Sequence, residues 1–195
     1  MHHASSGEPA HEGLSERACR LLAGLDTGLA GGILVLLWLS FFARMQGEFW
    51  WSKYNVAGAI FYGDRIFVMG LGRASLAGAA LLLLVYAGLG LLFSFLGRAR
   101  GFAFNLLAGL TVALLWHQLA DWLVWPRWHS AAPRFLNPFV MLPAHVIFGC
   151  ALIRFSPRFR RIAAALGDPA WSAQYRPAPP PVPGPVEDSS PHGDC

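Results

Sequence analysis

Long apolar runs separated by short polar segments are the dominant pattern along this chain. The runs cover residues 28–43, 74–96, 102–125 and 139–155, and almost no charged residue falls inside them. About 18 or more apolar residues are enough to cross a hydrocarbon layer of roughly 30 Å as a helix. The pattern therefore predicts an all-α membrane protein built as a bundle of four transmembrane helices.

The polar segments divide the chain into three parts. Residues 1–14 are polar, and residues 169–195 are rich in proline, so we expect both ends to be disordered. Residues 15–168 then form the transmembrane domain. Its spans are expected at about 26–44, 74–96, 102–125 and 138–155. Asn137 and Pro138 offer an N-cap and a first-turn proline for the fourth span, and Ser156-Pro157 is expected to end it.

The segment 47–72, between the first two spans, has a different character. It begins with Trp50 and Trp51 beside Glu48 and Lys53, a mixture of aromatic and charged residues that is typical of a membrane–water interface. Its apolar part is too short to span a membrane. We expect an interfacial or re-entrant helix that caps the outer end of the bundle, the end away from both termini.

Composition supports a membrane location and excludes several functions. Hydrophobic residues make up 55% of the chain and charged residues 13%, well below the roughly 25% charge of soluble domains. The net charge of +4 is not gathered on a soluble domain, so it does not indicate nucleic-acid binding. The three cysteines form no CxxC pair. The sequence also has no Walker loop and no nucleophile–base pair, so we expect no enzyme.

Basic residues near the span ends predict the orientation. Eight lie near the termini and the second loop, and six lie in the first and third loops. By the positive-inside rule, this difference places both termini in the cytoplasm. The abundance of alanine, glycine and leucine, with arginine far outnumbering lysine, suggests a bacterial source. We therefore expect a multi-pass protein of the bacterial inner membrane.

Small residues recur on the first span. Gly24, Gly28 and Gly32 are four residues apart, a spacing that lets two helix backbones approach closely. We expect this face to pack on another helix. It motivates the possibility of a homo-oligomer or of a place in a larger membrane complex, in addition to contact with the lipid bilayer.

The third span carries the one intramembrane polar cluster. Asn105, Gly109, Ala113, His117 and Asp121 follow at intervals of four and share one helix face. Ionisable residues inside a span usually face the bundle interior or a water-filled cavity. Asp121, one turn from His117, is expected to hold its imidazole by a hydrogen bond.

The fourth span adds a second histidine at a similar depth. Counting 1.5 Å per residue from the outer ends places His117 about 12 Å deep and His145 about 10 Å deep. Gly149 lies one turn from His145 and would let the helices approach, and Pro143 loosens the helix near it. Gln118 completes the candidate cluster of His117, Gln118, Asp121 and His145.

Three interpretations of this cluster remain open. In the first, the polar groups join the helices through hydrogen bonds of about 0.6 kcal/mol each. In the second, His117 and His145 bind a metal or a haem, with Ala113 and Gly149 leaving the room that a haem needs. In the third, the histidines and Asp121 carry protons or a solute. A quinone or lipid headgroup near the tryptophans of the third span is a further possibility.

The first interpretation leads to the expected function. It describes a small, non-catalytic structural or accessory membrane subunit without a cofactor. The alternative is a redox protein (haem, metal or quinone) or a proton or solute transporter that uses His117, Asp121 and His145.

Overall fold

The computed structural model describes residues 9–96, 101–128 and 132–165, which form helices and short turns without a strand. Four segments are long and apolar enough to cross a membrane: Glu16–Met45, Arg73–Leu96, Phe102–Arg127 and Pro138–Ala165. The predicted all-α bundle of four spans is confirmed, and the chain is a multi-pass membrane protein. Residues 1–8 and the proline-rich tail lie outside the described residues.

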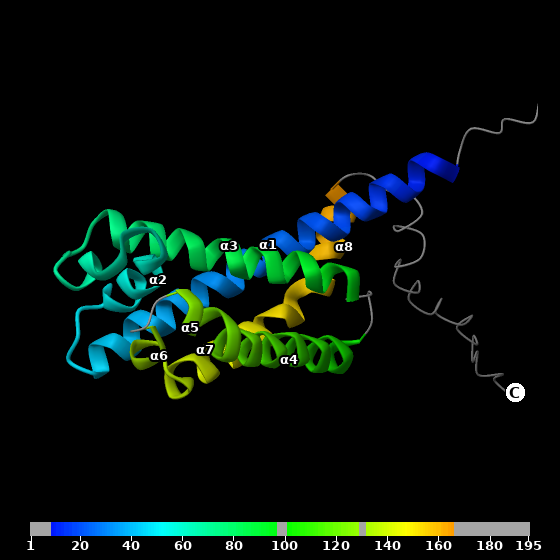
Figure 1. Cartoon of the computed structure of the whole chain (residues 1–195). Helices are drawn as coiled ribbons and strands as arrows, with labels where there is room; N and C mark the ends of the chain where they lie inside the picture. Colours follow the sequence, from blue (N-terminus) through cyan, green and yellow to red (C-terminus); the bar gives the residue numbers. More distant parts are fainter. Residues whose placement is uncertain (1–8, 97–100, 129–131, 166–195) are drawn as a thin grey trace, which may run out of the picture.

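Four long helices form the bundle, and shorter elements connect or extend them (Figure 1). The long helices are α1 (Pro9–Met45), α3 (Arg73–Leu96), α4 (Phe102–Leu119) and α7 (Pro138–Ala151). The short α-helices are α2 (Ser52–Tyr62), α5 (Trp125–Trp128), α6 (Ala132–Phe135) and α8 (Phe155–Ala165). Two 3₁₀ turns, η1 (Gly63–Phe67) and η3 (Leu152–Arg154), and one π-helical turn, η2 (Ala120–Val124), complete the order.

The bundle consists of two helix pairs. Helix α1 packs along α3, and α4 packs along α7 (Figure 1). Helix α1 also contacts α7 and α8, whereas α3 and α4, which follow each other in the chain, touch little. The two pairs are therefore held together mainly by α1.

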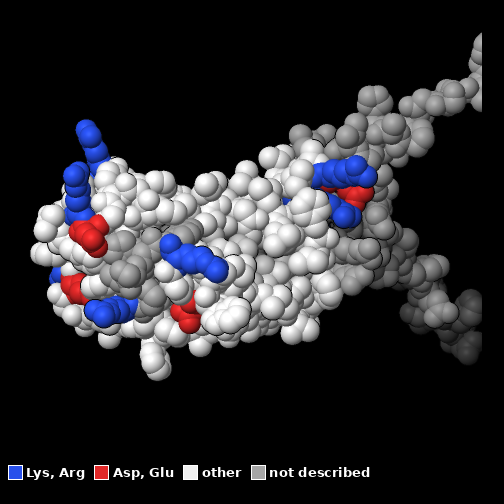
Figure 2. Space-filling model, viewed as in Figure 1, with Lys and Arg blue, Asp and Glu red and all other residues white. Residues whose placement is uncertain are grey.

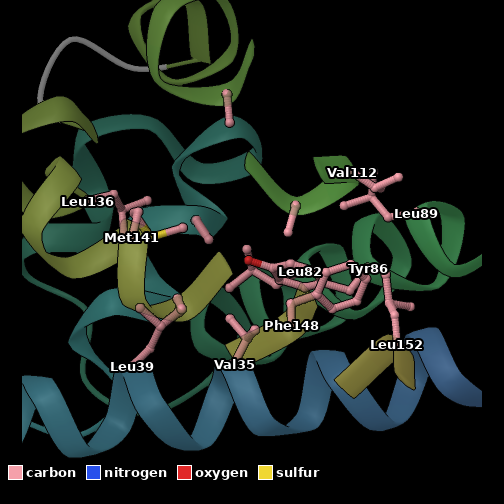
Figure 3. Packing of buried hydrophobic residues seen from close by; sticks show 14 of the residues in the cluster. Val35, Leu39, Leu82, Tyr86, Leu89, Val112, Leu136, Met141, Phe148 and Leu152 are labelled. Atoms are coloured by element: carbon pink, nitrogen blue, oxygen red, sulfur yellow. The ribbon is translucent and has the colours of Figure 1, made fainter. Parts of the chain in front are cut away.

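Large apolar side chains fill the space between the pairs. Figure 3 shows Val35 of α1 near Phe148 of α7, Leu39 one turn further along α1, and Leu82 and Tyr86 of α3 across from Val35. Each of these five side chains is at most 2% exposed. In a membrane, burial of this kind replaces contacts with lipid and fixes the helix contacts by close packing.

The outside of the bundle is apolar as well. Leu76, Leu84 and Leu107 are 70%, 70% and 68% exposed. Charged side chains gather toward the two ends and leave a largely uncharged belt between them (Figure 2). An exposed apolar belt of this size would be an aggregation hazard in water and is the normal surface against lipid.

Two helix boundaries differ from the prediction. Helix α1 begins at Pro9, inside the segment 1–14 expected to be disordered, because a first-turn proline fits a helix without loss of a hydrogen bond. Ser156-Pro157 does not end the fourth span. The α-helix gives way to the 3₁₀ turn η3 at Leu152 and resumes at Phe155, so that Pro157 lies in the first turn of α8, where its missing N–H costs little.

At the beginning of the fourth span, the predicted cap is confirmed: the Asn137 side chain accepts a hydrogen bond from the Val140 N–H (3.1 Å).

Helix α2 lies against the beginning of α3. A Cβ atom on Gly58 would collide with the carbonyl oxygen of Ala74, and one on Gly78 with that of Tyr54. These pairings run in opposite directions along the two helices, so α2 and α3 form an antiparallel hairpin. Helix α2 therefore folds back along the beginning of α3 and does not lie flat across the bundle end.

Candidate functional site

Helices α4 and α7 approach closely because glycines face each other. A Cβ atom on Gly109 would lie 2.5 Å from the carbonyl oxygen of Gly149, and one on Gly149 would lie 3.1 Å from the Cβ of Ala113. Such distances leave no room for side chains at either glycine. The backbones are therefore in contact two turns away from His117 on α4 and one turn away from His145 on α7.

This approach brings the two histidines together inside the bundle. The ring centres of His117 and His145 are 5.1 Å apart, with an angle of 49° between the ring planes. His117 is 7% exposed and His145 is fully buried. The two imidazoles thus form a pair, the histidine pair, that is shielded from both water and lipid.

The ring nitrogens of the histidine pair lack hydrogen-bond partners within the described residues. Nδ1 of His117 and both nitrogens of His145 are buried without one. The Met141 carbonyl, one turn before His145, lies near enough to act on its ring but does not have the geometry of a hydrogen bond. A buried polar group without a partner costs about 1–3 kcal/mol. Within the described residues, these three nitrogens therefore form none of the hydrogen bonds that would join two helices.

The surroundings of the histidine pair are aromatic and apolar. The Tyr86 ring of α3 lies 6.1 Å from the His145 ring and 4.8 Å from the Phe148 ring, measured between centres. Figure 3 shows Tyr86 and Phe148 packed together in the core. Three helices, α3, α4 and α7, thus supply the walls around the two imidazoles.

Two residues of the predicted cluster lie apart from it. Gln118 is exposed on the surface of the bundle, and Asp121 is half-buried. The expected hydrogen bond between Asp121 and His117 is absent from the described structure. A π-helical turn, η2, begins directly before Asp121, and in it the Trp125 N–H bonds to the Ala120 carbonyl five residues back.

The inner end of the polar stripe joins another helix. The Asn105 side-chain amide donates to the Ser156 hydroxyl over 2.5 Å, and both residues are buried. This bond connects α4 to α8. Asn105 therefore acts between helices and is separated from the histidine pair by Gly109 and Ala113.

The separation of the two imidazoles can be compared with that in a metal site. With metal–nitrogen bonds of about 2.0 Å and roughly 1.1 Å from nitrogen to ring centre, two imidazoles on a tetrahedral ion have ring centres about 5 Å apart. The observed 5.1 Å agrees with this value. The described residues contain no group of three or more histidine, cysteine, aspartate or glutamate side chains suited to a metal, so the pair would supply two ligands and leave other positions open.

A haem does not fit the same space. Two axial histidines on opposite sides of an iron have ring centres about 6 Å apart, with a flat macrocycle between them. Here the Gly149 backbone, one turn from His145, lies against Ala113 and Gly109, which are one and two turns from His117. The small residues expected to make room for a haem are instead used for contact between α4 and α7.

A second polar group, at the outer end of the bundle, was missed by sequence reasoning. The Lys53 ammonium pairs with Glu48 (3.0 Å) and lies 5.8 Å from the centre of the Phe135 ring. Lys53 is 2% exposed although it is the chain's only lysine. The sequence did contain a signal for this group: Lys53 is the only lysine and lies among apolar residues, where a lysine rarely serves to keep a protein in solution.

The neighbouring Tyr54 fastens α2 to the first span. Its hydroxyl donates to the Leu36 carbonyl (2.7 Å) and shares a hydrogen bond with Ser40. Burial raises the pKa of the Tyr54 phenol above its usual range, and the Ser40 contact offsets part of this rise. The phenol therefore stays neutral and keeps its hydrogen donor at physiological pH.

Comparison with protein-family models, with curated proteins and with solved structures finds no match to this chain.

Proposed function

We propose that this protein is a non-catalytic membrane protein that binds one transition-metal ion between His117 and His145. The observation that carries the proposal is the buried histidine pair, in which three ring nitrogens have no hydrogen-bond partner among the described residues and the ring centres are 5.1 Å apart. Imidazole nitrogen suits Zn²⁺ and copper ions. A bound ion would use the nitrogens that otherwise leave an energetic penalty inside the bundle.

The other expected roles have less support. The accessory-subunit role rested on the glycine face of the first span, and this face packs on α3 within the chain: a Cβ atom on Gly28 would lie 2.6 Å from the Tyr86 carbonyl oxygen. The proton-relay alternative rested on Asp121, which makes no hydrogen bond with His117 in the described structure. Metal binding is the alternative that agrees with the observed arrangement of His117 and His145.

The test is metal titration of the purified protein in detergent. Other histidines also offer imidazole ligands, so the starting variant carries alanine at His2, His3, His11 and His192 near the ends of the chain. We expect this variant to bind close to one Zn²⁺ or Cu⁺ per chain by calorimetry and elemental analysis. His117→Ala and His145→Ala should each weaken binding by at least about 100-fold, since removal of a mere supporting group already costs 10- to 100-fold. Gln118→Ala, at an exposed neighbouring position, is the matched control.

Two results would contradict the proposal. One is the absence of stoichiometric binding in the starting variant, and the other is unchanged binding after loss of both buried histidines. Thermal unfolding without metal gives a separate readout. Leucine at both positions should leave the metal-free protein equally stable or more stable, because leucine needs no hydrogen-bond partner. If the two histidines instead held the helices together by hydrogen bonds, the same substitutions would lower the stability.

We also propose that the protein lies in a bacterial inner membrane with both termini in the cytoplasm. The composition supports the source, and the eight-to-six distribution of basic residues supports the orientation. Alkaline phosphatase is active only outside the cytoplasm. A fusion of this enzyme after residue 50 should therefore be active and a fusion at the C-terminus inactive. The reverse pattern would overturn the orientation.

A further inference from the structure

Helix α8 carries an arginine stripe at the end of the bundle where α1 enters. Phe155, Phe159 and Ala163 of this helix are buried against the rest of the bundle. Arg154, at the end of η3, is followed by Arg158 and Arg161 after four and seven residues, a spacing that places the three on one helix face. The buried face therefore fixes the direction in which the arginines point.

The arginine stripe borders a hollow. A cavity of about 250 Å³ is lined by Arg154, Pro157, Arg158 and Arg161. This volume exceeds that of a phosphate group with its glycerol, and three of the four described residues that line it are arginines. The hollow is thus concave and strongly basic.

The positive charge of the hollow is only partly neutralised. Arg158 Nε lies 3.1 Å from Asp26 Oδ2 of α1, in an ion pair that is partly exposed. Arg154 and Arg161 have no carboxylate partner among the described residues. Within the part of the chain that the structure describes, two guanidinium groups therefore face one hollow without an acid between them, an arrangement that favours an incoming anion.

The position of the hollow indicates where the anion comes from. Helix α8 continues the fourth membrane-spanning segment, Pro138–Ala165. Charged side chains gather at this end of the molecule, next to the apolar belt (Figure 2). Phospholipid headgroups occupy the same level of a bilayer, and basic pockets at the ends of membrane helices bind anionic lipids.

We propose that the hollow binds the phosphate of an anionic phospholipid, held mainly by Arg154 and Arg161, while Arg158 stays paired with Asp26. Arginine forks match phosphate oxygens in a bidentate manner. The acyl chains would remain in the bilayer beside the fourth span. This site is independent of the histidine pair, which lies deeper in the bundle on α4 and α7.

The test is native mass spectrometry of the full chain released from detergent supplied with phosphatidylglycerol, cardiolipin or phosphatidylcholine. We expect bound phosphatidylglycerol or cardiolipin on the wild type and little phosphatidylcholine. R154Q/R161Q should weaken binding of the anionic lipid roughly 30-fold, at about fivefold for each basic residue near a membrane surface. The control is R127Q/R134Q, which removes two exposed arginines near the outer end of the bundle.

Each other outcome would overturn the proposal. Equal loss of lipid in both double variants would show a general charge effect instead of a site. Unchanged lipid binding in R154Q/R161Q would exclude the hollow. Complete displacement of the lipid by inorganic phosphate at about millimolar concentration would assign the hollow to a free anion. Unfolding curves of R154Q/R161Q should match those of the wild type, so that lost binding is not lost folding.

Discussion

At the scale of single residues, the most constrained positions are glycines at which two backbones touch. A Cβ atom on Gly24 would lie 2.6 Å from the carbonyl oxygen of Gly90, and one on Gly90 would lie 2.6 Å from the Cα of Gly28. The obstructing atoms belong to backbone, which cannot rotate away. Even a methyl group at this contact must push α1 and α3 apart.

The matched pair Gly90→Ala and Gly88→Ala tests this constraint. Both glycines lie in α3, but a Cβ atom on Gly88 meets nothing within 4 Å. We expect Gly90→Ala to lower the free energy of unfolding by about 1–3 kcal/mol through overpacking. Gly88→Ala should leave it unchanged or raise it by up to about 1 kcal/mol through helix propensity. Unfolding in mixed micelles measures both; equal effects would contradict the close contact of α1 and α3.

The two histidines show which features of the site can be predicted from the sequence and which cannot. The similar depth of His117 and His145 could be predicted by counting residues from the span ends, because helix rise is constant. Their separation of 5.1 Å could not. It depends on how far α4 and α7 are rotated about their axes, and this rotation is set by the contact between Gly109 and Gly149.

At the scale of elements, α2 is held by polar side chains as well as by packing. The Asn55 amide donates to the Met69 carbonyl (2.9 Å), and its carbonyl oxygen accepts from the Ser75 hydroxyl (2.5 Å). Asn55 is 5% exposed. One side chain thus connects α2, the turn after η1 and the first residues of α3.

Asn55→Ala should loosen this outer hairpin. The substitution leaves the Ser75 hydroxyl and the Met69 carbonyl without their partner, at a cost of about 1–3 kcal/mol. We expect faster amide hydrogen exchange over residues 63–72 and little change in α4 and α7. Thr111→Ala, which removes one exposed hydrogen bond to the Leu107 carbonyl, is the control. Uniform exchange changes along the chain would contradict a local role for Asn55.

The elements were predictable to different degrees. The four spans follow from apolar length alone, which is why they were found. The antiparallel contact of α2 with α3 depends on Gly58 and Gly78, which no span criterion considers. The π-helical turn η2 had no recognisable signal in its residues.

At the scale of the whole molecule, the connection between α3 and α4 contributes little to assembly. The two helix pairs are joined through α1, which touches α7 and α8. The Trp38 indole donates to the Val140 carbonyl (3.0 Å), and Asp26 pairs with Arg158. On α1, Gly31 lies where a Cβ atom would be 2.7 Å from the Phe148 ring. The first half of the chain, with α1 and α3, and the second half, with α4, α7 and α8, are therefore held together by direct contacts of α1.

Two fragments, 1–98 and 99–195, should consequently assemble when they are produced together. We expect them to co-purify in mild detergent with a tag on either fragment and to retain the thermal unfolding profile of the intact chain within a few degrees. Gly31→Leu in the first fragment should abolish co-purification, because leucine would collide with Phe148 of α7. Independent migration of the unmodified fragments would show that the connection is needed after all.

The π-helical turn η2 has a consequence for how the length of this chain can change. A π turn holds one residue more than the α-helix around it, so it resembles an insertion that the fold has already absorbed. Removing one residue between Ala120 and Val124 would restore regular α-helix and keep both flanks facing their present neighbours. Elsewhere in a span, the same deletion would turn everything beyond it by about 100°. Natural length variation within the third span is therefore expected to concentrate in this turn.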